Sequence, residues 1–234
     1  MSEGKVRIEE KILNEVRQMF DGLTSQVTLH MFTNKHHCLL CNETLDLAEQ
    51  IANQSDKITL DHCECTLDSE KAQKWKIERH PAIAIEGKGK GMIRFFGIPS
   101  GYEFGSLIES IIMSGSDKGV ELEPELVEEI KKIDQSIHLQ VFVTPTCPYC
   151  PRAVLNAFKF AILNENITAD MIEATEFQDL SMQYQVQGVP KTIINDDWIE
   201  EEDDGEILRY PKWSVVGAVP EKALLNKVKE ALRE

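Results

Sequence analysis

The chain has 234 residues, 42% of them hydrophobic, with 25 basic and 40 acidic side chains for a formal net charge of −15. This length allows two domains of ordinary size. The negative charge argues against binding to nucleic acid or anionic lipid, since both would be repelled. No stretch approaches the ~20 apolar residues of a membrane span, and the first residues lack the apolar core of a secretory signal, so the sequence predicts a cytoplasmic protein.

The first half of the chain predicts alternating helices and strands. Apolar residues at three- to four-residue spacing indicate the helices, and short apolar or alternating runs indicate the strands. The expected elements are a helix over 6–20, a strand over 26–33, a helix over 38–52, a strand over 57–65, a helix over 67–78, strands over 82–86 and 92–96, and a helix over 102–113.

The second half predicts the same order of elements again. They are a helix over 123–134, a strand over 137–144, a helix over 147–163, a strand over 167–174, a helix over 177–185, strands over 191–195 and 212–216, and a helix over 221–233. A repeat of this length indicates two copies of one domain. The small and polar residues 114–119 read as the link, which gives predicted domains 1–117 and 118–234.

The spacing of two residue types supports the repeat. Cys38 precedes Pro81 by 43 residues, and Cys147 precedes Pro190 by the same number. The loop before the first cysteine is expected to be two residues longer in the first copy. The second copy inserts residues 198–210 between its last two strands, and their acidic run predicts a solvated hairpin tip, with docking to a basic partner as the alternative.

Two Cys-x-x-Cys pairs carry the chemistry that the sequence suggests. Cys38 and Cys41, like Cys147 and Cys150, stand at the start of a predicted helix. Thiols three residues apart lie on one helical face, and the positive end of the helix dipole stabilises a thiolate. Pro148 suits the first helical position, which would place Cys147 near the N-cap as the more acidic thiol. In a chain without an export signal, such pairs indicate redox chemistry or metal binding.

These elements resemble the thioredoxin fold: a strand, Cys-x-x-Cys at a helix start, then Gly188-Val189-Pro190 opening a strand pair and a last helix. Cys147-Pro-Tyr-Cys150 is typical of glutaredoxins. Two such units in tandem, together with the segment from Phe95 to Phe104, resemble the glutaredoxin-like protein disulfide oxidoreductases of hyperthermophilic archaea and bacteria.

The resemblance implies an α/β fold. It implies two tandem thioredoxin-like units, each a mixed four-stranded sheet flanked by helices, with an added N-terminal helix per unit and with the two sheets joined edge to edge. It also assigns roles to the cysteines. Cys147 would attack a substrate disulfide and Cys150 would resolve the intermediate, while Cys38 and Cys41 would do the same in the first unit.

The resemblance further implies that Pro81 and Pro190 are cis prolines facing the cysteines. The residues before them, His80 and Val189, would then offer backbone groups to an extended substrate segment. An ordinary proline at a strand start is the alternative. Because the first unit has Arg79 where the second has glycine, its peptide groove is expected to differ.

An apolar rim is expected around the two sites, where it would bind exposed segments of unfolded partners, although some of its members could instead pack inside. Its members are Leu39, Leu40, Pro148, Tyr149 and Val189.

The expected function is thiol–disulfide exchange that reduces, forms and isomerises disulfides in cytosolic proteins. A thioredoxin-reductase-like flavoprotein would be the redox partner, and no bound cofactor is expected. The alternatives are a dedicated electron carrier to a peroxiredoxin, and a non-enzymatic metal-binding or chaperone-like module. Leu39-Leu40 is an unusual dipeptide between redox cysteines, so the first pair could be redox-active or structural, and the second unit is expected to carry the stronger activity.

Cys63 and Cys65 admit three interpretations: buried small residues, a third redox pair, or metal ligands together with His62. Direct bonding would need a bend, since residues i and i+2 of a strand lie about 6.5 Å apart. A protonated His37 would lower the pKa of the adjacent Cys38 thiol, with a plain surface histidine as the alternative. A zinc site in the first unit is the less favoured alternative, and no metal is predicted. Its ligands would come from His36, His37, Cys38, Cys41, His62, Cys63 and Cys65.

Overall fold

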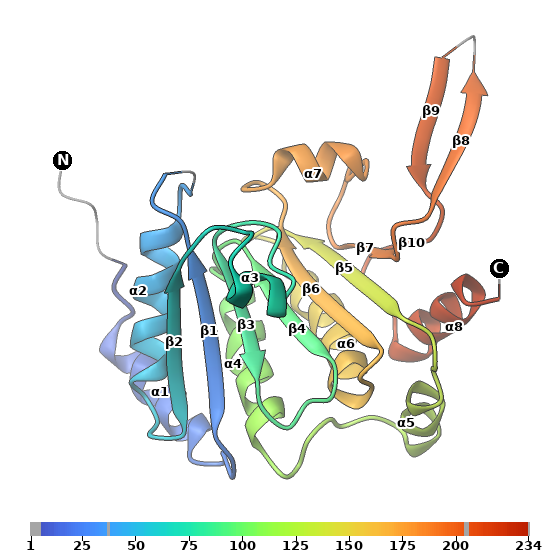
Figure 1. Cartoon of the computed structure of the whole chain (residues 1–234). Helices are drawn as coiled ribbons and strands as arrows, with labels where there is room; N and C mark the ends of the chain where they lie inside the picture. Colours follow the sequence, from blue (N-terminus) through green and yellow to red (C-terminus); the bar gives the residue numbers. More distant parts are fainter. Residues whose placement is uncertain (1–5, 37, 204–205, 234) are drawn as a thin grey trace.

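The structure is a computed structural model that describes residues 6–36, 38–203 and 206–233 (Figure 1). The helices are α1 (Glu10–Phe20), α2 (Cys41–Ala52), α3 (Glu70–Lys74), α4 (Glu103–Gly115), α5 (Pro124–Lys131), α6 (Cys150–Leu163), α7 (Gln178–Gln183) and α8 (Glu221–Ala231). The strands are β1 (Val27–Thr33), β2 (Ile58–Glu64), β3 (Ala82–Glu86), β4 (Met92–Phe96), β5 (Ile137–Val143), β6 (Ile167–Glu173), β7 (Lys191–Ile194), β8 (Trp198–Asp203), β9 (Glu206–Pro211) and β10 (Ser214–Val216).

One eight-stranded sheet runs through the molecule in the order β10-β7-β5-β6-β4-β3-β1-β2. Each half of this order is a mixed four-stranded sheet with the same connectivity, so the predicted pair of thioredoxin-like units is confirmed. The units meet edge to edge, as expected, where β4 pairs in parallel with β6. The inserted residues form a separate antiparallel hairpin, β8–β9, that projects away from the sheet (Figure 1).

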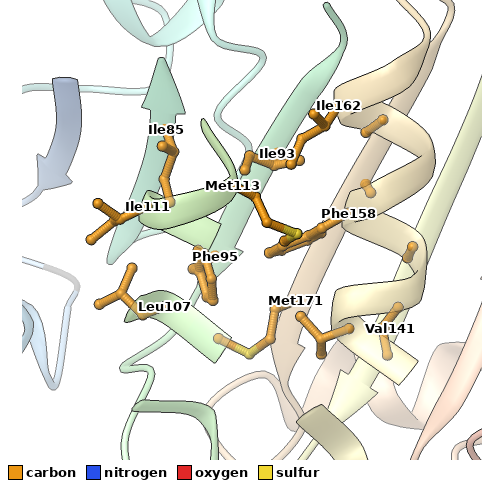
Figure 2. Packing of buried hydrophobic residues seen from close by; sticks show 14 of the residues in the cluster. Ile85, Ile93, Phe95, Leu107, Ile111, Met113, Val141, Phe158, Ile162 and Met171 are labelled. Atoms are coloured by element: carbon orange, nitrogen blue, oxygen red, sulfur yellow. The ribbon is translucent and has the colours of Figure 1, made fainter. Parts of the chain in front are cut away.

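Inner strands such as β1 and β5 are buried on both faces because helices cover each face, whereas edge strand β2 is partly exposed. On β5, Leu139 and Val141 face the larger core under α4 and α6, whereas Phe142 faces a smaller core with Tyr184 beside α7. At the junction the two units share one core, in which α4 packs against α6 and the ring of Phe95 meets that of Phe158 edge-on at 5.1 Å (Figure 2).

Backbone geometry repeats between the units. Lys76 and Gln185, at equivalent positions just after α3 and α7, have φ angles of 51° and 49°. Gly97 and Gly217 both have φ of 88°, which favours glycine, and each donates its N–H to the carbonyl of a cis proline.

Strand pairing corrects the expected loop length. Thr33 pairs with Glu64 on β2, and Val143 pairs with Glu173 on β6, so Thr33 corresponds to Val143 and not to Thr144. The loop before the first cysteine is therefore one residue longer in the first unit, not two.

The link between the units also begins later than expected. Helix α4 continues to Gly115, where any side chain would collide with Leu23 and Val27. The small residue is thus required by packing rather than by a flexible link. The proposed boundary between residues 117 and 118 lies between α4 and α5, and it stays a prediction.

A buried ion pair spans the junction of the units. Arg94 of β4 lies opposite Asp170 of β6, and its Nε and Nη2 each donate to the carboxylate at 2.7 Å. Arg94 also donates to the carbonyls of Trp75 and Lys76, and His138 Nε2 lies 2.6 Å from Asp170 Oδ2. Burial alone would raise the pKa of Asp170, but Arg94 and His138 outweigh it and lower that pKa to about 2.

Within the described residues, no helix is at once long enough and apolar enough to cross a membrane.

Candidate redox sites

The second Cys-x-x-Cys pair forms a disulfide at the end of β5. Cys147 and Cys150 have Cα atoms 5.5 Å apart, and the chain turns tightly between them, with the Cys150 N–H donating to the Cys147 carbonyl. Helix α6 begins at Cys150 with Tyr149 as its N-cap, so the prediction of Cys147 near the N-cap and Pro148 at the first helical position is wrong. The helix begins about one turn later because this tight turn precedes it.

Exposure differs sharply along this second turn. The side chains of Pro148 and Tyr149 are exposed, whereas Cys147 is 8% exposed and Cys150 is fully buried. Cys147 is therefore the more accessible of the two cysteines. Both cysteines lie close to the positive end of α6, which favours a thiolate there.

The first pair, Cys38 and Cys41, forms a disulfide with the same Cα separation of 5.5 Å. Helix α2 begins at Cys41, again with the residue before it as N-cap. Cys41 is buried and its sulfur accepts a hydrogen bond from the Asn34 N–H at 3.3 Å. Cys38 is half-buried and so more open than Cys147, and the intervening Leu39 is 89% exposed.

Both prolines predicted to be cis are cis: the His80–Pro81 and Val189–Pro190 bonds. Val189 is half-buried against the core cluster that includes Cys147 and Cys150. His80 is also half-buried, and burial lowers its pKa. The substrate-binding roles of these four residues stay predictions.

The first site opens on a cleft of about 970 Å³ that both units line. Leu39, Leu40, His80 and Pro81 contribute one wall, and the segment 175–179 before and within α7 contributes the other. The structure thus brings the first unit's expected rim and proline together.

An ion pair crosses this cleft between the units. Arg79, the residue that replaces glycine, donates to Asp179 at 2.8 Å and lies over the ring of Phe177. The second unit has Gly188 at the equivalent position, so the surroundings of the two prolines differ here.

Two acidic residues near the sites were missed by sequence reasoning. Burial raises the pKa of Glu176 to about 7. The hydrogen bond from the Ile98 N–H acts in the opposite direction, and the negative charges of Glu173 and Glu43 add to the increase. Burial likewise raises the pKa of Glu103 to about 7. Glu103 follows Tyr102, whose N–H donates to the Pro145 carbonyl in the loop before Cys147. Nothing in the sequence signalled this, because both lie where the units meet: Glu176 accepts from the Ile98 N–H of the first unit, and the residue before Glu103 donates to Pro145 of the second.

The expected apolar rim is only partly exposed. Leu39, Pro148 and Tyr149 are exposed, while Leu40 and Val189 are half-buried. Binding of unfolded segments at these residues stays a prediction.

The remaining candidate residues do not gather into one site. Cys63 and Cys65 are free and half-buried, and His62 Nε2 instead lies 2.7 Å from the Thr33 hydroxyl. Over the described parts of the chain, no three His, Cys, Asp or Glu side chains are grouped as metal ligands. His37 lies outside the described residues, so its expected effect on Cys38 stays a prediction.

Comparison with known proteins gives the same fold. The family model for the thioredoxin domain matches residues 137–200. The crystal structure of a protein disulfide oxidoreductase from Aeropyrum pernix has 29% sequence identity and a TM-score of 0.82, over 97% of this chain and 95% of that one. The alkylhydroperoxide reductase protein AhpF of Enterococcus faecalis has 24% identity and a TM-score of 0.80, over 94% of this chain and 99% of the solved chain, which shows a shared fold.

A curated relative is similar over part of its length. The alkyl hydroperoxide reductase protein AhpF of Staphylococcus aureus is 30% identical over 154 residues, or 65% of this chain, and the match spans 27% of that relative. Together, these likenesses and the two disulfides describe a tandem thioredoxin-fold protein with two Cys-x-x-Cys redox sites that resembles the protein disulfide oxidoreductases.

Proposed function

We propose that this protein reduces, forms and isomerises disulfides in other proteins of the cytoplasm. The observation that carries the proposal is the pair of Cys-x-x-Cys disulfides, each at a helix start with an exposed apolar side chain between the cysteines. The likeness to a protein disulfide oxidoreductase over 97% of the chain supports it.

The exchange follows from the order of exposure in each pair. A thiolate at Cys147 attacks a substrate disulfide, which forms a mixed disulfide and releases one substrate thiolate. Cys150 then attacks the Cys147 sulfur, which releases the second substrate thiolate and leaves the pair oxidised. Cys38 and Cys41 act in the same way, with the half-buried Cys38 attacking and the buried Cys41 resolving. The reverse steps donate a disulfide to a dithiol.

The substrate would lie as an extended segment beside each cis proline. Backbone groups of Val189 or His80 would pair with it, and the apolar rim would hold its side chains. At the first site the segment would lie in the cleft between the units, where Arg79 and Asp179 line its path.

A thioredoxin-reductase-like flavoprotein would supply electrons to the oxidised pairs. Under this scheme the chain works through its own sulfurs, and the flavin belongs to the partner.

A second candidate function is electron transfer to a peroxiredoxin. The similarity to the alkyl hydroperoxide reductase protein AhpF favours it. In that case the exchange chemistry is unchanged, but the recipient is one folded enzyme instead of many unfolded chains.

Insulin reduction by the wild type and by three variants tests the proposal. The variants are Cys38→Ser with Cys41→Ser, Cys147→Ser with Cys150→Ser, and all four together. We expect each double variant to keep part of the activity, the quadruple variant to lose it, and the second unit to account for the larger share. Turnover that survives the quadruple substitution would refute the proposal, and efficient transfer to a peroxiredoxin with negligible insulin turnover would favour the electron carrier.

A further inference from the structure

A third pair of thiols lies at the end of edge strand β2. Cys63 lies on β2 and Cys65 is the first residue after it, and both pack against the smaller core beside Phe32. The Cys65 thiol donates to the Cys63 carbonyl oxygen at 3.6 Å, and the Cys65 thiol is close enough to Cys63 to raise the pKa of Cys63. The pair is half-buried, so small oxidants can reach it.

One peptide group joins this pair to the first redox site. The Thr33 carbonyl accepts a hydrogen bond from the Cys65 N–H at 3.0 Å. The N–H on the other side of the same peptide bond, that of Asn34, donates to the Cys41 sulfur at 3.3 Å. A movement of Cys65 therefore acts on the donor to Cys41 through a single rigid plane.

The second unit provides a natural comparison. Ala174 occupies the position of Cys65, and its N–H donates to the Val143 carbonyl at 2.9 Å. Ile172 occupies the position of Cys63. The hydrogen bond to the carbonyl at the strand end is thus common to both units, while thiols stand at these two positions in the first unit alone.

We propose that Cys63 and Cys65 are a third dithiol whose oxidation to a disulfide regulates the Cys38–Cys41 site through the Thr33–Asn34 peptide. The inference rests on the proposed exchange function of that site.

The oxidation is a disulfide exchange. Cys65 attacks a disulfide RSSR, such as oxidised glutathione or the Cys147–Cys150 bond of another copy, and releases RS⁻. Cys63 then attacks the Cys65 sulfur, so that the Cys63–Cys65 bond forms, a second RSH leaves, and the oxidant gains the two electrons. The first attack falls to Cys65 because it lies beyond the end of β2, whereas burial, followed by the neighbouring thiol, raises the pKa of Cys63 to about 11.

Bonding would move the end of the strand. Extended residues at i and i+2 have Cα atoms about 6.5 Å apart, whereas disulfides favour about 5.5–6 Å. Because β2 ends at Glu64, Cys65 is free to bend inward, and its bond to the Thr33 carbonyl then weakens.

The direction of the effect follows from hydrogen bonding. A sulfur that carries or shares the negative charge of the reduced pair accepts a stronger hydrogen bond than a disulfide sulfur, so a weakened Asn34 donor to Cys41 costs the reduced site more than the oxidised site. Oxidation of the third pair should therefore make the Cys38–Cys41 disulfide about three- to tenfold harder to reduce.

The test uses the full chain with Cys147→Ser and Cys150→Ser, equilibrated in glutathione buffers, alkylated and digested with trypsin. Peptide 36–57 carries Cys38 and Cys41, and peptide 58–71 carries Cys63 and Cys65, so the pairs are read separately. We expect peptide 58–71 to become internally bonded. We also expect reduction of the Cys38–Cys41 bond, read from peptide 36–57, to need a buffer about three- to tenfold more reducing than the same bond needs in the Cys63→Ala/Cys65→Ala variant.

Cys65→Ala is the matched control, since it keeps the backbone N–H, resembles Ala174 and cannot bond. It should behave like the double alanine variant. The inference is overturned if peptide 58–71 stays fully alkylated in buffers that oxidise peptide 36–57, or if its bonding leaves the behaviour of peptide 36–57 unchanged. The titration needs no protein substrate, so these outcomes are independent of the insulin assay, whose failure would count against the proposed function alone.

Discussion

The two redox sites share a scaffold but differ in what surrounds them. Each has a disulfide at a helix start and a cis proline whose carbonyl accepts a glycine N–H. The first cysteine is half-buried at the first site and buried at the second, and the first site faces a cleft that the other unit helps to build. The repeat therefore places the sulfurs, whereas contacts between the units determine access to the first site.

The last helices of the two units show the same contrast. Glu103 in α4 and Ala223 in α8 occupy equivalent first-turn positions, where each N–H donates to the carbonyl three residues earlier. Glu103 is buried at the start of α4, the helix that packs against α6 of the second unit, while Ala223 is exposed. A position that is exposed in the second unit is thus buried in the first, and its carboxyl group has a raised pKa.

Breaking the junction should have the largest effect. We expect Arg94→Leu to lower the free energy of unfolding by about 3–5 kcal/mol, because it leaves the buried Asp170 carboxylate without its main partner. Urea unfolding of wild type and variant measures the loss.

A double variant controls for packing. Arg94→Leu with Asp170→Leu removes both charges and should recover much of the lost stability. A loss below about 1 kcal/mol in the single variant, the range of a surface ion pair, would show that the pair does not hold the units together.

Glu103 should make stability depend on pH. Its pKa is raised to about 7 when folded, so the folded state binds the proton more tightly than the unfolded state. The stabilisation is complete below pH 4.5, is lost as pH rises from about 4.5 through 7, and amounts to about 3 kcal/mol. Glu103→Gln removes this dependence, and urea unfolding at pH 5 and pH 8 measures it.

Glu176 must be considered in the same experiment. Its pKa is also raised to about 7, so a pH dependence remains in the Glu103 variant. The difference between wild type and variant isolates Glu103. If that difference is the same at both pH values, Glu103 does not hold its proton in the folded state.

The sequence predicted the fold and the cysteine pairs because both follow from local patterns. Each Cys-x-x-Cys pair and its proline lie within one unit. The repeat is visible because the 43-residue spacing from Cys38 to Pro81 recurs from Cys147 to Pro190. Burial of Glu103 and Glu176, the Arg79–Asp179 pair and the cleft depend on contacts between units, which no local pattern encodes. The start of α6 was misplaced because the tight Cys147–Cys150 turn precedes the helix.

Exchanging the residues before the prolines should alter substrate use. With Cys147→Ser and Cys150→Ser present, we expect Arg79→Gly with His80→Val to raise kcat/KM for insulin at the first site about tenfold, since the cleft loses its crossing ion pair. The reciprocal control is Gly188→Arg with Val189→His in a chain lacking the first site. A Cβ added at Gly188 meets no atom within 4 Å, so the position has room for the start of a side chain and that variant should fold. Equal changes of the same sign in both units would contradict the comparison.

Changes in the β8–β9 hairpin should have the smallest effect. The hairpin projects beside β10, at the edge of the eight-stranded sheet opposite to β1 and β2, and so lies far from the first site (Figure 1). Arg209 covers the ring of Trp198 at 4.6 Å, and its carbonyl accepts from Gln185. We expect Arg209→Ala to lower the free energy of unfolding by about 0.5 kcal/mol, the contribution of an exposed cation–π contact. Insulin reduction should be unchanged at both sites, because residue 209 keeps its backbone carbonyl, which still accepts the hydrogen bond from the Gln185 side chain. If turnover fell at the second site alone, the hairpin would contribute to the difference between the two sites, contrary to this expectation.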